Sequence, residues 1–145
     1  MITNDRQYRI TKAELRRFEV NLAAQDARDR SPDVDPRIHQ AMRDGIASEA
    51  EELRAQLHHY EQLRDGQITE REITSLRELP TALIEARIAA RLTQRDLAQR
   101  VGVAEQQIQR WEANDYAGVN LERLQNIADA LGIHIHETIT YQPAA

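Results

Sequence analysis

The residues best equipped for chemistry lie in one short run, which reads Glu-Gln-Gln-Ile-Gln-Arg from Glu105 to Arg110. A helix fits the major groove of B-DNA, where glutamine can pair bidentately with adenine, arginine with guanine, and glutamate can accept from cytosine. These groups surround a single apolar residue, Ile108, that can bury while the others stay exposed. The run therefore predicts recognition of base edges. The alternative is an ordinary solvated helix face.

No arrangement in the sequence predicts catalysis. The chain has no cysteine, which excludes disulfides, thiolate catalysis and cysteine zinc sites. It shows no glycine-rich phosphate loop, nucleophile elbow or paired carboxylates. His134 and His136 could share one face of a strand beside Glu137, but no third metal ligand has a suitable spacing, and His58 and His59 point in different directions on a helix. We therefore expect no enzyme, no cofactor and no metal site.

Composition and charge narrow the class of protein further. Hydrophobic residues make up 41% of the 145 residues and aromatic residues only 4%, which favours an aliphatic, helical core. Because the net charge is −5, contact with nucleic acid requires a local basic face. Four arginines, at positions 91, 95, 100 and 110, lie in or near the segment 93–112 that contains the polar run. With no signal peptide and no membrane-spanning run, we expect a cytoplasmic protein without a membrane partner.

The polar run must be positioned by the helices on either side of a tight turn. Residues 94–101 and 105–114 are predicted to be two short helices, with Ala98 allowing close approach and Gly102 at the turn, where a positive φ suits glycine. The apolar residues that should turn inward from both helices are Leu97, Val101, Val103, Ile108 and Trp111. The agreement of the small residue, the turn glycine and the apolar set predicts a helix-turn-helix.

Because it contains this predicted helix-turn-helix, segment 79–133 resembles the helix-turn-helix domain of the Cro/C1 or Xre family of bacterial and phage repressors. The resemblance implies a five-helix domain whose second motif helix enters the major groove. It implies base contacts from Glu105, Gln106 and Arg110, and contacts to phosphates or neighbouring bases from Gln94 and Gln107. Arg95 and Gln109, beside these positions, complete the predicted DNA-binding set. Glu105 would repel phosphates, so we expect one subunit to bind DNA only modestly.

The same resemblance implies a structural ion pair. Arg87 and Glu112 match a partly buried salt bridge that joins the first helix of such domains to the end of the recognition helix. Their role would be structural, because removing one partner of a buried pair leaves the other charge stranded. Trp111 is similarly expected to lie in the core rather than to stack on bases.

The remaining elements follow from periodicity and capping signals. Residues 1–10 could be a loose arm or a short strand. Thr11 with Glu14 forms a possible capping box and predicts a helix over 12–28. A loop over 29–35 should follow it. Asp35 and Pro36 should begin a long amphipathic helix that stops near Asp65-Gly66. Its narrow apolar seam comprises Ile38, Met42, Ile46, Ala50, Leu53, Leu57 and Tyr60.

Further signals follow along the chain to its end. Thr69 with Glu72 predicts a short connecting helix, and Pro80 should start a new helix after it. Asn120 should cap a last helix that stops at Gly132. Beyond it the apolar period changes to two in residues 133–141, which favours a strand. Such a strand would need a partner, either the N-terminal arm or its twin in another subunit.

The sequence thus predicts a mainly α protein with three parts. Residues 1–78 form a helical hairpin for dimerisation or partner binding, 79–132 form the DNA-binding domain, and 133–145 form a strand and tail. The predicted function is a repressor that binds double-stranded DNA as a homodimer, with self-association outside the helix-turn-helix. The alternative is an antitoxin whose N-terminal helices bind a toxin protein, while the helix-turn-helix regulates its own operon.

Overall fold

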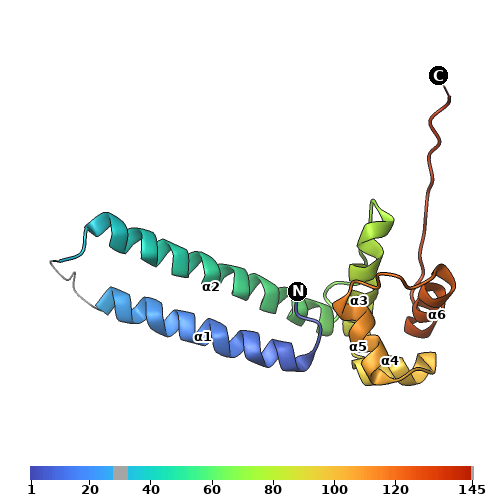
Figure 1. Ribbon diagram of the computed structural model, residues 1–145, viewed down its shortest axis with the longest axis horizontal. Coiled ribbons are helices and arrows are strands. Elements are labelled where there is room, and N and C mark those ends of the chain that lie inside the picture. Colours follow the sequence, from blue (N-terminus) through green and yellow to red (C-terminus); the bar gives the residue numbers. More distant parts are fainter. Residues whose placement is uncertain (28–32, 145) are drawn as a thin grey trace. The chain divides into compact units, whose positions relative to one another are not determined.

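The computed structural model describes residues 1–27 and 33–144, and within them every regular element is helical (Figure 1). The order is α1 (Asp5–Ala27), α2 (Pro36–Arg64), the short 3-10 helix η1 (Leu76–Glu78), α3 (Leu79–Ala89), α4 (Gln94–Val101), α5 (Glu105–Ala113) and α6 (Leu121–Leu131). The chain divides into two compact units, Met1–Glu72 and Ile73–Ala145. None of the described helices combines the length and apolar character that a membrane span requires.

The first unit is a hairpin in which α1 and α2 lie side by side and run in opposite directions (Figure 1). α1 begins at Asp5, so the predictions of an arm or strand over 1–10 and of a capping box at Thr11 are wrong. The helix starts earlier because Asn4 caps it: its side-chain oxygen accepts from the Gln7 amide at 2.9 Å. Thr11 is therefore inside α1. Arg28 and residues 29–32 of the predicted loop lie outside the described residues.

The start and end of α2 agree with the sequence prediction. The side chain of Asp35 accepts a hydrogen bond from the Arg37 amide at 2.9 Å, and Pro36 occupies the first turn. Asp65 caps the other end, where Gly66 has a φ of 75°. The α-helix therefore begins and stops where these local signals lie.

Aromatic and ionic contacts fix the register of the hairpin. Near the start of α1 and the end of α2, the rings of Tyr8 and Tyr60 stack with their centroids 5.3 Å apart. The Tyr8 hydroxyl donates to Glu61 at 2.5 Å, and the Tyr60 hydroxyl donates to Asp5 at 2.9 Å. Further along, Arg54 contacts Glu19 at 3.1 Å and Arg43 contacts Asp26 at 2.7 Å. Because those ion pairs are about half exposed, they specify register more than they stabilise the fold.

The connection between the units differs from its prediction. Thr69 and Glu72 cap no helix, and the first regular element after α2 is the single turn η1. Ser75 caps that turn, because its hydroxyl accepts from the Arg77 amide at 3.3 Å. α3 then begins at Leu79 with Pro80 in its first turn, as the proline predicted.

The second unit contains four α-helices in residues 79–132, where the family resemblance implied five. Asn120 caps α6 by accepting from the Arg123 amide at 2.9 Å, and Gly132 ends it with a φ of 68°, both as predicted. The core is aliphatic with one tyrosine, and its buried residues are Leu83, Ile84, Ile88, Leu97, Ala98, Ile108, Tyr116, Ile127, Ala128 and Leu131.

The predicted C-terminal strand is absent from the described residues. Residues 133–144 follow α6 as an extended tail, on which Ile139 and Tyr141 are 72% and 84% exposed (Figure 1). The two-residue apolar period is present, but a strand exists only when its backbone pairs with another strand. The start of the chain cannot pair with it, because α1 is helical from Asp5. The strand prediction is therefore wrong.

Candidate nucleic-acid interface

The first helix of the motif, α4, is held by a cap that the sequence analysis missed. The hydroxyl of Thr93 accepts from the Asp96 amide at 3.1 Å, and the Asp96 carboxylate accepts from the Thr93 amide at 2.8 Å. The Thr93 hydroxyl also donates to the Asp96 carboxylate at 2.7 Å. This side-chain hydrogen bond and the one from the Thr93 amide lower the pKa of Asp96 below its usual value, because both favour the carboxylate. The Thr-x-x-Asp spacing is a sequence signal that could have revealed this capping box.

Gly102 forms the turn between α4 and α5. It has a φ of 78°, and its amide donates to the Ala98 carbonyl at 2.9 Å, as does the amide of Val103. This left-handed conformation ends α4 and directs the chain into α5. Gly102 therefore has the role that its position in the sequence predicted.

We expect Gly102→Ala to lower the free energy of unfolding by about 1–2 kcal/mol, the usual cost of a left-handed conformation for an L-residue. A β-carbon at this site would meet no atom within 4 Å, so only the backbone conformation contributes. Urea denaturation followed by circular dichroism measures the change. Gly45→Ala, inside α2 and equally unobstructed, is the control and should stabilise its helix slightly. An unchanged midpoint for Gly102→Ala would contradict the prediction.

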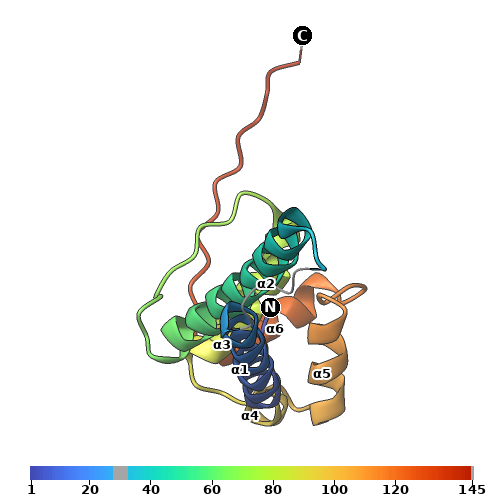
Figure 2. The same cartoon turned by 90° about the vertical axis from the view of Figure 1, so that its left-hand side faces the viewer.

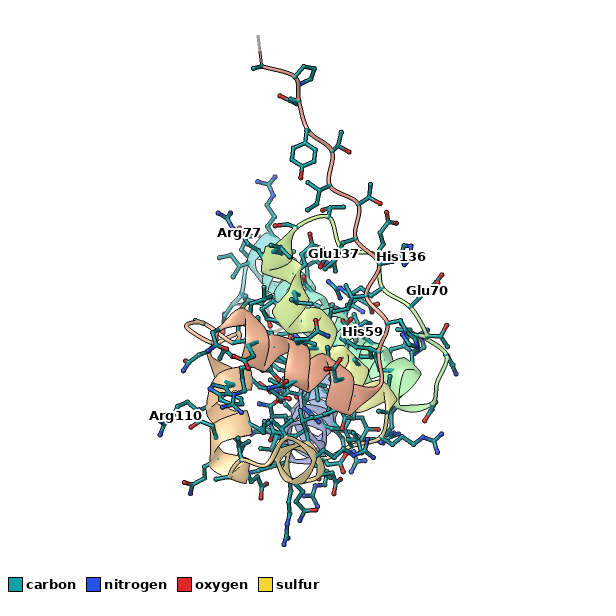
Figure 3. The ribbon with its side chains drawn as sticks, turned by 90° about the vertical axis from the view of Figure 1, so that its right-hand side faces the viewer. His59, Glu70, Arg77, Arg110, His136 and Glu137 are labelled. Atoms are coloured by element: carbon teal, nitrogen blue, oxygen red, sulfur yellow. The ribbon has the colours of Figure 1, made fainter. Side chains whose placement is uncertain are left out.

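The second helix of the motif, α5, has one buried side and one polar side. Ile108 is fully buried, whereas Glu105, Gln106, Gln109 and Arg110 are exposed. α5 lies at the edge of its unit in two views, and the labelled Arg110 side chain points away from the other helices (Figures 2 and 3). The structure thus brings these four predicted residues together on one accessible helix.

The matching family model agrees with this arrangement. Residues 83–137 match a family model described as helix-turn-helix. They form a Cro/C1-type helix-turn-helix domain. No curated protein and no solved structure matched the chain. A domain of this type implies DNA binding and a part in transcriptional regulation.

Two predicted DNA-binding glutamines of the helix-turn-helix domain are only partly accessible. Gln94 and Gln107 are both half-buried. The side-chain nitrogen of Gln94 donates to Glu112 at 2.7 Å, which uses one of its two amide hydrogens inside the domain. On the exposed side, the side-chain nitrogen of Gln109 donates to the Glu105 carboxylate at 3.2 Å, so one amide hydrogen of Gln109 is also used within α5.

The arginines of the domain are not equivalent. Arg91, Arg95 and Arg110 are exposed, as a basic face for phosphates requires. Arg100 is also exposed, but its guanidinium donates to the Ala130 carbonyl at 3.2 Å and so links the end of α4 to α6. The local positive charge expected from the sequence is therefore present, and Arg100 is hydrogen-bonded to a neighbouring helix.

Arg87 and Glu112 form a buried, bidentate ion pair in the core of the domain. The two arginine nitrogens lie 2.6 and 2.8 Å from the two carboxylate oxygens, and the side chains are only 3% and 1% exposed. Arg87 also donates to the Leu92 carbonyl at 2.9 Å. With the Gln94 contact, this network connects α3, the α3–α4 turn, the start of α4 and the end of α5. Its contribution to stability remains a prediction.

Tyr116 is a core residue that the sequence analysis did not single out. It follows α5, has a φ of 54° next to Asp115 at 49°, and is 3% exposed. Its hydroxyl has no hydrogen-bond partner among the described residues. Burial raises the pKa of Tyr116 above its usual value, and the nearby Glu112 charge adds to this. A tyrosine in a polar loop gives no periodicity that could have predicted this burial.

The tail histidines do not form a metal site in the part of the chain described. His134, His136 and Glu137 are exposed, and Figure 3 shows His136 and Glu137 along the extended tail. Within residues 1–27 and 33–144, no group of three or more histidine, aspartate or glutamate side chains could hold a metal ion.

Proposed function

We propose that this protein is a sequence-specific repressor that places α5 in the major groove of its operator. The observation that carries the proposal is the two-sided character of α5: Ile108 is fully buried, while Gln106, Gln109 and Arg110 are exposed. Amide and guanidinium groups are suited to reading adenine and guanine. Arg95, exposed at the start of α4, supplies positive charge for a phosphate.

We further propose that the repressor acts as a homodimer. A single recognition helix reads only a few base pairs, and Glu105 weakens the attraction of α5 to phosphates. Two copies bound to half-sites about 34 Å apart would increase both affinity and selectivity. The operator should then be partly palindromic.

Selection of bound sequences from a random DNA pool tests this proposal, and the selected site allows the readout to be measured. Gln106→Ala and Arg110→Ala should each weaken operator binding by about 1–3 kcal/mol and leave binding to random DNA nearly unchanged. The losses differ because base contacts discriminate among sequences, whereas phosphate contacts do not. Fluorescence anisotropy at fixed salt concentration measures both affinities.

Matched controls are available on other elements. Gln125→Ala on α6 and Arg77→Ala on η1 remove the same chemical groups from exposed sites and should leave operator affinity unchanged. Figure 3 labels Arg77 and Arg110, which lie on different helices of the domain. Equal losses of Gln106→Ala or Arg110→Ala on operator and random DNA would assign these residues to phosphates. Failure of the wild type to select any sequence would refute the proposed function.

A second candidate function is that of an antitoxin whose hairpin binds a toxin protein. It is favoured by large apolar side chains exposed on the hairpin, among them Ile38 and Met42, each 57% exposed. Purification of the full chain from its native host tests this candidate. A small stoichiometric partner that inhibits growth when expressed alone would support it, and a chain that purifies without a partner would count against it.

A further inference from the structure

The carboxylates of α1 are directed toward α2. The helix contains four of them, and three contact side chains of α2, namely Asp5, Glu19 and Asp26. The fourth, Glu14, directly precedes the half-buried Leu15. The side of α1 that faces away from α2 therefore carries none of its carboxylates.

Four arginines of α1 occupy that outward side. Each is two positions from a half-buried residue, which is about 200° around the helix at 3.6 residues per turn. All four are exposed, and within residues 1–27 and 33–144 none of them forms an ion pair with a carboxylate. We call this surface the arginine face, and it comprises Arg6, Arg9, Arg16 and Arg17.

The arginine face is a local basic surface on an acidic chain. Residues 5–17 carry five lysines and arginines and two carboxylates, a net charge of +3, whereas the whole chain has a net charge of −5. Arg6 and Arg17 are separated by about 16 Å along the helix axis at 1.5 Å per residue. That length matches roughly four or five phosphates on one DNA strand, which are spaced ~3.4 Å apart along the duplex axis. Guanidinium groups donate bidentately to phosphate oxygens.

The other residues of this surface favour a phosphate backbone over a protein partner. Ala13 lies at the centre of the arginine face, and Val20 lies beyond Arg17. Protein interfaces depend on aromatic and large apolar anchors at their centre, whereas contacts to a phosphate backbone need only charged donors. The same chain contains a helix-turn-helix domain, so DNA held by that domain would meet the hairpin at a high effective concentration.

We propose that the arginine face contacts the phosphate backbone of the DNA that the helix-turn-helix domain binds. This deepens the proposed function by giving the hairpin a second, sequence-independent contact, and its part in operator binding rests on that function. Phosphate contacts carry no sequence information, so the arginine face would strengthen binding to every sequence without changing which sequence is preferred.

The salt dependence of DNA binding by the full chain tests this contact. Each phosphate contact contributes about 0.9 to the slope of log affinity against log salt concentration. Arg9→Gln, Arg16→Gln should therefore make the slope shallower by about 1.8, so that between about 50 and 200 mM salt the wild type loses about tenfold more affinity than the variant. Fluorescence anisotropy should show the same change on the selected operator and on random DNA.

Matched variants separate a local contact from a general effect of charge. Arg37 is exposed on α2 and forms no ion pair in the described part of the chain, so Arg37→Gln changes the net charge as Arg9→Gln does. Arg9→Gln should change the slope by about 0.9, and Arg37→Gln should leave it unchanged.

A variant that gains a contact excludes misfolding as the cause of any loss. Ala13→Arg adds a fifth arginine to the arginine face and should make the slope steeper by about 0.9. Ala55→Arg is its control, because Ala55 is exposed on α2, two positions from the buried Leu57, and faces away from α1. It should leave the slope unchanged, and circular dichroism should show equal helix content in both variants.

Several results would overturn the proposal. A wild-type slope in Arg9→Gln, Arg16→Gln would refute the contact, and equal effects of Ala13→Arg and Ala55→Arg would reduce it to general charge. Unchanged DNA binding with loss of a co-purifying acidic protein would assign the arginine face to that protein instead. The proposed function fails separately. A wild type that selects no sequence, but whose slope on random DNA still exceeds that of the double variant, would refute operator recognition and leave the backbone contact intact.

Discussion

Replacing either Arg87 or Glu112 with alanine is expected to lower the free energy of unfolding of the helix-turn-helix domain by about 3–5 kcal/mol. The pair is bidentate and 1–3% exposed, so each single variant leaves a desolvated charge without its partner. The loss should exceed that of a surface pair such as Arg43 and Asp26, whose side chains are about half exposed. Urea denaturation of each variant provides the measurement.

A double-mutant cycle separates this pair from unrelated effects. The variant Arg87→Ala, Glu112→Ala should be no less stable than either single variant, because the stranded charge is then gone. Glu122→Ala and Arg77→Ala, at exposed sites on α6 and η1, remove the same charges and should change stability by less than about 0.5 kcal/mol. Strictly additive losses in the cycle would show that the two side chains are not coupled.

Ile108→Ala is expected to lower the free energy of unfolding by about 2–5 kcal/mol, the usual cost of truncating a buried aliphatic side chain. Ile108 has no exposed surface and is the only aliphatic side chain of α5 larger than alanine. Its loss removes apolar burial and leaves a cavity under the helix that carries Gln106 and Arg110. Operator affinity should fall with stability, because a poorly held α5 loses its fixed geometry.

The neighbouring residue supplies the control for this prediction. Gln109→Ala changes the exposed side of the same helix and should leave the free energy of unfolding within about 0.5 kcal/mol of the wild type. Thermal and urea denaturation of both variants can be compared directly. A stable Ile108→Ala protein with unchanged operator affinity would show that α5 is held mainly by the Glu112 network.

The sequence by itself determined elements whose signals are local. Asp35 with Pro36 predicted the start of α2, Gly102 predicted the turn, and Asn120 predicted the cap of α6, and the structure confirms all three. A cap depends on a side chain and an amide two or three residues away, and a left-handed turn depends on the absence of a β-carbon. Such interactions can be inferred without knowing what lies elsewhere in the chain.

The polar side of α5 was predictable for the same reason. Once Ile108 is taken as buried, the 3.6-residue period leaves Gln106, Gln109 and Arg110 on the exposed side, where the structure has them. Glu105, three residues before Ile108, would share its side by period, but the structure exposes it in the first turn of α5. Which bases or phosphates they contact remains a prediction. The sequence pattern predicts which side chains of α5 are exposed, but it carries no information about the DNA groups that those side chains would contact.

Contacts between distant segments decided the rest. α1 extends back to Asp5, where Tyr8 stacks on Tyr60, and Gln94 donates to Glu112 on another helix. The residues after Gly132 have a strand-like period but no strand, because the backbone hydrogen bonds of a strand must come from a partner segment. Periodicity describes how one segment divides its apolar and polar sides. Only the tertiary structure shows what, if anything, lies against each side.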